Sequence, residues 1–422
     1  MYKKMFLAIL SLILICSMAV NLTGCATKVQ AADLMEGVQA NTVTGKAADD
    51  AFAQSQMRLA VELFQSSVLE SKDENVLISP LSIQLALAMT ANGADGNTKA
   101  EMEALLGGEI SLEDLNEYLY SHVNNLPSAE KYKLQIANSI WFRDDEGRLQ
   151  VEKDFLQKNA NYYGAQAYKA AFDDQTLKDI NNWVKDHTDG MIDSILDQID
   201  EDAVMYLINA LVFDAEWQHV YDKSDVYKGK FTNIGGTEKQ VDMMHSEETV
   251  YLQDENAIGF MKPYSGSKYN FAVLLPNEGV DIYEYIAGLT GESLMETLST
   301  PQLGMVMATL PKFSYEYELT MNDVLKELGM PSAFSGDTAD FSKMAHSSRG
   351  NIYIGDVLHK TFISVDELGT KAGAVTKVQM NDESAPMSEW VVTLNRPFVY
   401  MIIDNKTNLP VFIGTVMDVQ GG

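Results

Sequence analysis

The sequence predicts an α+β fold, and three observations lead to this prediction. Stretches with apolar residues at helical spacing alternate irregularly with strand-like runs, rather than forming the regular strand–helix–strand units of a parallel sheet. Beyond the N-terminal region, no second linker interrupts a span of about 370 residues, which is more than a typical single domain contains. No short internal repeat or low-complexity tract divides this span. We therefore expect one large domain.

The individual elements follow from the spacing of apolar residues along the chain. Apolar positions three and four residues apart predict helices at residues 51–69, 79–91, 98–106, 112–123, 152–161, 175–185 and 319–328. Runs rich in β-branched and aromatic residues predict strands at residues 134–142, 203–213, 271–275, 305–311, 361–365 and 391–403. This order has no regular alternation, which is why a mixed α+β domain is expected.

The first residues have the pattern of a secretory signal. Lys3 and Lys4 precede an apolar run at residues 5–20, which indicates a signal peptide rather than a membrane-spanning helix. Leu22-Thr-Gly-Cys25 follows and resembles a bacterial lipobox, in which cleavage leaves Cys25 as the first residue and its thiol carries a diacylglycerol. An incidental free thiol at Cys25 is the alternative.

These features divide the chain into a signal peptide at residues 1–24, a flexible tether at residues 25–48 and a folded domain at residues 49–420. The tether is rich in small and polar residues and has no aromatic side chain. Because Cys16 falls within the signal, the mature chain would hold no disulfide. We expect the protein outside the cytoplasm, on a bacterial cell surface or anchored to its membrane, and extracellular if shed.

The chain is strongly acidic. Its formal net charge is −29, and loss of Lys3 and Lys4 with the signal would take it to −31. Nucleic acid binding requires clustered Lys and Arg, so no nucleic acid partner is expected. The compact motifs of hydrolases, metalloproteases and phosphate-binding enzymes are missing, and the six histidines are scattered without metal-ligand spacing. We therefore expect neither an enzyme nor a bound metal or cofactor.

One segment near the C-terminus, residues 367–386, has the pattern of both a strand and a loop. As a strand, it would place mostly small residues on one face, namely Thr370, Ala372, Ala374, Thr376, Val378 and Met380. As a loop, it has Gly369 at its base and a polar tip at residues 381–384 before Pro386. Small inward residues suit a crowded slot in a sheet. An ordinary edge strand followed by a turn is the alternative.

Seven motifs occur along the chain in a set order. The hinge motif consists of Glu367, Gly369, Thr370 and the small residues 372–376, and a C-terminal motif spans residues 392–402 around Arg396-Pro397-Phe398. The upstream motifs are at residues 75–83 with 93–98, 136–141, 209–217, 310–313, and 328–334 with 339–342. The ordered set resembles the serpin family over about residues 49–418.

The resemblance implies a serpin fold with three β-sheets, about eight or nine helices and an exposed reactive-centre loop at about residues 368–390. It implies an inhibitor of serine proteases that acts as a suicide substrate. The protease cleaves the loop, stays attached as an acyl-enzyme and is displaced as the loop inserts into the central sheet. The alternative is a non-inhibitory serpin that serves as a binding or carrier module. The unbroken run of small residues after the hinge favours the inhibitor.

The resemblance also carries expectations about partners. Serine proteases would form a covalent complex with the protein, and cysteine proteases are a second class of target. Some serpins bind polyanionic cofactors through a basic helix, but residues 100–130 contain no Lys or Arg, so no heparin-like activator is expected. The protein is expected to act as a monomer.

Site residues follow from the motif positions. The family's hinge corresponds to Glu367, Gly369, Thr370, Ala372, Gly373, Ala374, Val375 and Thr376. The family's shutter, a polar network below the opening sheet, corresponds to Ser79, Ser82, Asn209 and His359, for which ordinary buried hydrogen bonding is the alternative. The breach at the top of the sheet corresponds to Trp217 and Lys312, and there Glu367 would meet Lys312 as a charged pair.

Two hinge positions depart from the family pattern, and the position of the reactive bond follows by counting. Leu368 replaces a commoner polar residue, and Lys371, which replaces the usual Glu, should point outward. Glu383 lies 14 residues after Gly369, the spacing that the resemblance implies for the residue recognised by the protease. The reactive bond would then be Glu383–Ser384. A shift of the register leaves Asp382, Ala385, Met380 and Met387 as alternatives.

Overall fold

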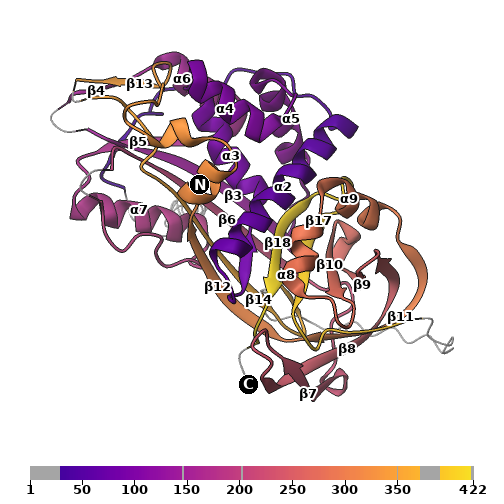
Figure 1. Ribbon diagram of the computed structural model, residues 1–422. Coiled ribbons are helices and arrows are strands. Elements are labelled where there is room, and N and C mark those ends of the chain that lie inside the picture. Colours follow the sequence, from indigo (N-terminus) through magenta and orange to yellow (C-terminus); the bar gives the residue numbers. More distant parts are fainter. Residues whose placement is uncertain (1–28, 145–146, 201–202, 349, 371–389, 420–422) are drawn as a thin grey trace, which may run out of the picture.

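The computed structural model describes residues 29–144, 147–200, 203–348, 350–370 and 390–419. Figure 1 shows helices α3 to α6 gathered at one end, beside a long sheet that crosses the molecule. Helices α8 and α9 lie at the other end with the strands of a second sheet (Figure 1). The α+β class is confirmed, with nine α-helices and three sheets within the described ranges.

The helices begin where polar residues cap apolar stretches. They are α2 (Asp50–Glu70), α3 (Pro80–Ala91), α4 (Gly96–Gly107), α5 (Leu112–Asn125), α6 (Lys153–Tyr163), α7 (Asp174–His187), α8 (Ile282–Gly288), α9 (Gly291–Ser299) and α10 (Asn322–Glu327). Asp49 Oδ1 accepts a hydrogen bond from Phe52 N ahead of α2, and Ser79 Oγ accepts one from Ser82 N ahead of α3. Every residue of α3 is buried, so this helix lies in the middle of the domain.

The first large sheet has seven strands in the order β1-β5-β3-β6-β15-β14-β12. Their bounds are β1 (Ala32–Asp33), β5 (Gln166–Ala170), β3 (Tyr132–Arg143), β6 (Met205–Glu216), β15 (Gly369–Thr370), β14 (Asp356–Val365) and β12 (Phe313–Thr320). β6 is buried along nearly all of its length, as a central strand covered on both faces should be. This sheet carries the candidate site.

The second large sheet has nine strands. Eight follow the order β16-β11-β8-β9-β10-β17-β18-β2, and β7 pairs with β8. Their bounds are β16 (Trp390–Thr393), β11 (Gln302–Pro311), β8 (Glu238–Gln253), β9 (Ala257–Pro263), β10 (Tyr269–Pro276), β17 (Phe398–Asp404), β18 (Pro410–Val416), β2 (Val76–Ile78) and β7 (Val226–Thr232). The third sheet consists of β4 (Leu149–Val151) and β13 (Ala345–Ser347). Three 3-10 turns lie at Lys223–Asp225, Ser265–Ser267 and Pro331–Phe334.

Two apolar clusters hold these layers together. The larger one joins the helices around α3 to the second large sheet, and the smaller one packs α7 against the first sheet. In the smaller cluster, the rings of Trp141 and Tyr168 stack with their centroids 4.4 Å apart. Both cysteines of the chain lie outside the described residues, so packing rather than disulfide bonding holds the described part together.

Two predicted elements are wrong in their bounds. The strand expected at residues 391–403 is two strands, β16 and β17, separated at Arg396-Pro397, where proline cannot donate to a ladder. The helix expected at residues 319–328 begins only at Asn322, because the residues up to Thr320 pair with β14 as the end of β12. Within the described residues, no helix is both long and apolar enough to cross a membrane.

The expected flexible tether also differs from the structure over its described part, residues 29–48. Gln30 N and Ala31 N each donate to Asp179 Oδ2 at 2.8 Å, and β1 then pairs with the edge of β5. Farther along, Lys46 N donates to the carbonyl of Glu117 in α5. These contacts are made mostly by the backbone, which is why a composition of small and polar residues gave no sign of them.

Candidate functional site

Strand β15 occupies one end of a slot between β6 and β14. Thr370 pairs antiparallel with Ala215 of β6 and with Val365 of β14, and Gly369 pairs with Glu216. Glycine is required at position 369, because a Cβ there would lie 2.0 Å from the carbonyl oxygen of Ala215. The two-residue strand therefore holds β6 and β14 apart at this end.

At the opposite end of the slot, β6 and β14 pair directly with each other. The pairing is parallel and joins residues 206–209 to residues 356–359, ending at Asn209 opposite His359. Between the two ends, residues 210–214 of β6 and 360–364 of β14 face each other across a stretch where the described strands do not pair. Among the described strands, β6 and β14 are therefore paired at one end of the slot and unpaired along the rest of it; we call these the closed end and the open end.

The turn that leads into β15 is held at the open end. Trp217 donates from its indole Nε1 to the carbonyl of Asp366 at 2.9 Å, and from its backbone N to the carbonyl of Leu368 at 2.8 Å. The side chains of Lys312 and Glu367 form an ion pair beside this turn. The structure therefore brings together the expected breach residues and the start of the expected hinge.

At the closed end, four buried polar residues form one network. The backbone N–H of Ser79 donates to His359 Nε2 at 3.1 Å, and the Ser82 hydroxyl donates to Asn209 Oδ1. Asn209 Nδ2 in turn donates to the carbonyl of Ser82 at 2.9 Å. The structure therefore brings the four expected shutter residues together, and two of them, Asn209 and His359, form the last pair of the β6–β14 ladder.

His359 is neutral in this network. It is fully buried, and burial lowers its pKa to about 3. Its Nε2 accepts from Ser79, so the ring proton is on Nδ1. Nδ1 has no hydrogen-bond partner among the described residues. The closed end of the slot therefore contains a buried donor that finds no acceptor in the described part of the chain.

Several predicted site residues lie outside the described residues. They are the later hinge residues, the reactive-bond residues with their alternatives, and the lipidation site: Ala372, Gly373, Ala374, Val375, Thr376, Met380, Asp382, Glu383, Ser384, Ala385, Met387 and Cys25. The predicted reactive-centre loop at residues 368–390 is described only at its two ends. Their positions and roles stay predictions.

Sequence reasoning missed three residues that contact the site. Asn138 of β3 accepts from Asn209 Nδ2, which extends the network at the closed end. Tyr264 contacts Thr370 through its hydroxyl, and Tyr221 N donates to the carbonyl of Glu367 at 3.0 Å. Asn138 is part of the quoted motif at residues 136–141, so a signal was present there. Tyr264 and Tyr221 carried no such signal, because their contacts depend on strand pairing.

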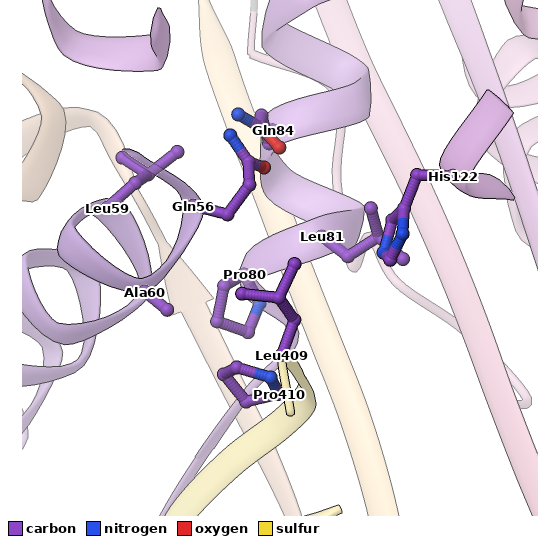
Figure 2. Close-up of a pocket in the computed structure, with 9 residues that line it drawn as sticks. All are labelled: Gln56, Leu59, Ala60, Pro80, Leu81, Gln84, His122, Leu409 and Pro410. Carbon is purple, nitrogen blue, oxygen red and sulfur yellow. The ribbon is translucent and has the colours of Figure 1, made fainter. Parts of the chain in front are cut away.

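A small cavity lies behind the closed end, between α2, α3 and the start of β18 (Figure 2). It is lined by Gln56, Leu59, Ala60, Pro80, Leu81, Gln84, His122, Leu409 and Pro410. Its volume of about 20 Å³ is enough for roughly one water molecule. The cavity therefore cannot hold a substrate or cofactor.

Comparisons with known proteins agree with this geometry. Residues 54–419 match the family model "Serpin (serine protease inhibitor)". The crystal structure of the thermophilic serpin tengpin in its native state is 53% identical, with a TM-score of 0.89 over 93% of this chain and 100% of that chain. Tengpin in its latent state, 52% identical, aligns with a lower TM-score of 0.80 over 89% of this chain and 100% of that chain.

A curated relative extends the comparison to another organism. The serine protease inhibitor of Cyanea capillata is 30% identical over 369 residues, which cover 85% of this chain and 96% of the relative. The family match, the sequence identity and the structural similarity to tengpin all agree. The chain belongs to the serpin family.

Proposed function

We propose that this protein inhibits serine proteases as a suicide substrate, through cleavage of its reactive loop, trapping of the acyl-enzyme and insertion of the loop into the seven-stranded sheet. One observation carries the proposal. β15 already lies between β6 and β14, and the rest of the hinge sequence follows Thr370, the last described residue of this strand. Insertion would lengthen a strand that is already in the sheet.

The pairing of β15 determines where the next residues would lie if the strand continued. Counting on from Thr370, Ala372 would lie between Phe213 of β6 and Ile363 of β14, on the same face as Thr370. Both neighbours are buried, so the space between them is narrow. Ala374 would follow the same pattern two residues later. Small side chains at these positions suit the slot, whereas a charge or a proline there would stop insertion.

Thr376 would reach the closed end of the slot. The same count places it between Asn209 and His359, the first directly paired residues of β6 and β14. Residues 371–375 would therefore join open strand edges, whereas insertion beyond them has to separate the β6–β14 ladder. The exchange is favourable, because an inserted strand bonds to both neighbours in place of the single ladder lost. There the Thr376 hydroxyl could accept from Nδ1 of His359, which has no other partner among the described residues.

The proposed reaction uses the catalytic groups of the protease. The protease serine Oγ attacks the carbonyl carbon of the reactive residue, the peptide C–N bond breaks, and the new amine leaves with a proton. The protease is then joined to this chain by an ester. The ester persists because the displaced protease cannot assemble the oxyanion hole that hydrolysis requires.

The bond that we assign is Glu383–Ser384, on the basis of its spacing from Gly369. Glu383 would suit a glutamate-preferring protease, whose basic pocket can pair with the carboxylate. A shifted register would place Asp382 at the bond for an aspartate-directed enzyme. The apolar alternatives, Ala385, Met380 and Met387, would suit elastase-like or chymotrypsin-like enzymes.

The lipobox supports a location outside the cytoplasm, with the protein anchored to a bacterial membrane through a lipid on Cys25. Gln30 and Ala31 are bound to Asp179 of α7, so only a few residues would separate the lipid from the folded domain. The inhibitor would therefore lie close to the membrane surface, where it could protect the cell surface from secreted proteases.

Incubation with a panel of proteases of different specificity tests the proposed function. We expect one class to give a covalent complex of about the summed mass on a denaturing gel. Intact-mass analysis of the released C-terminal peptide then identifies the bond, and a peptide beginning at Ser384 supports the assignment. A peptide beginning at Asn381, Pro386 or Ser388 with efficient complex formation would refute Glu383. Cleavage without any complex across the panel would reject inhibition and leave a binding or carrier role.

A further inference from the structure

The segment that follows β6, residues 217–221, holds the hinge turn at residues 366–368 through three hydrogen bonds. All three consecutive carbonyls of the turn accept. Asp366 receives the indole N–H of Trp217 at 2.9 Å, Glu367 receives the backbone N–H of Tyr221 at 3.0 Å, and Leu368 receives the backbone N–H of Trp217 at 2.8 Å. We call residues 217–221 the hinge clamp. The position of the turn depends on where the clamp holds these donors.

A buried ion pair lies against the clamp. Lys262 in β9 is 1% exposed and Glu248 in β8 is 6% exposed, and Lys262 Nζ lies 2.8 Å from Glu248 Oε1. The same ammonium lies 4.3 Å from the ring centroid of Tyr221 and 5.5 Å from that of Trp217. The charge therefore contacts the side chains of Trp217 and Tyr221 in the clamp.

Two hydroxyl groups, those of Ser246 and Tyr221, also lie beside this ion pair. Ser246 Oγ donates to Glu248 Oε1 at 2.7 Å and lies 3.3 Å from the Tyr221 hydroxyl. Burial alone would lower the pKa of Lys262, but attraction by Tyr221 and Glu248 outweighs this effect and leaves the pKa above its ordinary value. Lys262 therefore stays charged at neutral pH and keeps its contacts with the two rings.

A buried ion pair is a weak source of stability, because removing two charges from water costs about as much as their attraction returns. Apolar side chains of similar volume would fill this site equally well. What the charge adds is direction, since a cation is attracted to the faces of aromatic rings and to a carboxylate at defined distances. Here those attractions act on Trp217 and Tyr221, which supply all the donors of the clamp.

We propose that Lys262 is a positioning residue for the hinge. Its ammonium, fixed by Glu248, orients Trp217 and Tyr221 so that the hinge clamp holds residues 366–368 in place while the chain beyond Thr370 enters the slot in register. The effect on inhibition rests on the proposed function. The effect on the clamp does not, because it exists in the protein before any protease is present.

The test uses the double variant Lys262→Met with Glu248→Met in the full chain, which removes both charges and leaves neither buried alone. The matched control is Lys230→Met with Glu238→Met, an exposed pair in β7 and β8 at 2.6 Å that is not part of the clamp. We expect amide hydrogen exchange of residues 217–221 to accelerate by about tenfold in the first variant and to stay unchanged in the control. Unchanged exchange in the first variant would overturn the proposal.

Inhibition gives the second measurement. More molecules of the first variant should be cleaved for each protease molecule trapped, while the rate of the first cleavage stays the same. If hydrogen exchange becomes faster but the number of inhibitor molecules consumed per protease trapped does not change, the proposed link between the clamp and insertion would be overturned. If the wild type traps no protease, the proposed function fails, and hydrogen exchange alone then tests whether Lys262 positions the hinge clamp. If the double variant does not fold, Tyr221→Leu removes one ring and keeps both charges, and unchanged exchange of residues 217–221 there would equally overturn the proposal.

Discussion

The hydroxyl of Tyr264 lies 2.5 Å from Oγ1 of Thr370, and both side chains are buried beneath the point where the hinge enters the sheet. Burial raises the pKa of Tyr264, so its hydroxyl stays neutral and can share a hydrogen bond with the threonine at all physiological pH values. The Tyr264 ring also stacks on Trp217 with centroids 4.6 Å apart. Position 370 therefore has space for a small side chain and a polar partner for its hydroxyl.

Substitution of Thr370 should convert the inhibitor into a substrate. Thr370→Arg puts a long charged side chain where Thr370 is 2% exposed between β6 and β14, so β15 should leave the slot and the chain beyond it should be unable to insert. We expect the number of inhibitor molecules consumed per protease trapped to rise by at least about tenfold, with little change in the rate of first cleavage. Thr370→Ser keeps the hydroxyl and serves as the control. An unchanged yield of covalent complex in Thr370→Arg would reject the trap.

The ion pair between Lys312 and Glu367 should matter more for kinetics than for equilibrium stability. The two side chains are 29% and 31% exposed, so the pair contributes about 1 kcal/mol or less. We expect Glu367→Gln to change the melting temperature by only a few degrees, but to speed the spontaneous loss of inhibitory activity during warm incubation. The measurement is residual activity against time, with Lys312→Met and the double variant completing a thermodynamic cycle. Equal decay in all four proteins would count against a role for the pair.

His359 should make stability fall as the pH drops. Burial lowers its pKa to about 3, whereas an unfolded histidine has a pKa of about 6.5, so between these values only the unfolded chain binds the proton. The free energy of unfolding should fall by up to about 1.4 kcal/mol for each pH unit below about 6.5. In His359→Gln, an amide oxygen can replace the Nε2 acceptor without titrating. Denaturant unfolding at pH 7 and pH 5 should show a loss smaller by about 2 kcal/mol in the variant. Identical losses would show that His359 is not the group responsible.

Lipidation at Cys25 can be tested apart from inhibition. Cys25→Ser removes the thiol that would carry the lipid, so it should abolish labelling by a radioactive or clickable fatty acid and release the protein from the membrane fraction. Protease trapping by the released protein should stay at the wild-type level, since the described contacts of the domain begin beyond this residue. Labelling that persists in the variant would refute the lipobox.

The elements that the sequence predicted best are those with continuous local patterns. The strand expected at residues 134–142 lies within β3, and the helix expected at residues 79–91 matches α3, whose serine cap and mostly apolar composition are visible without any tertiary information. The predicted bounds of an element were wrong where pairing with another strand determines its structure. Thr320 belongs to a strand because β14 lies beside it, although its own neighbourhood has a helical pattern.

The residues of the candidate site also differ in how far the sequence could predict them. Glu367 and Lys312 could be paired in advance because both belong to recognisable motifs. Lys262 and Glu248 could not, since a charged residue within a strand-like run predicts an exposed face. Their burial follows from the pairing of β8 with β9 and from the aromatic rings that pack over the ammonium. Such a pair becomes visible only once the sheet is assembled.

Strand insertion is the central claim, and hydrogen exchange at the edges of the slot tests it most directly. The measurement compares residues 210–214 of β6 and 360–364 of β14 before and after a protease has cut the chain between residues 371 and 389. If the loop inserts, exchange should slow by at least about a hundredfold in both stretches, because their backbone groups gain hydrogen-bond partners. Peptides from β10 and β17 in the other large sheet should be unaffected. Unchanged exchange at both edges of the slot after complete cleavage would contradict the account.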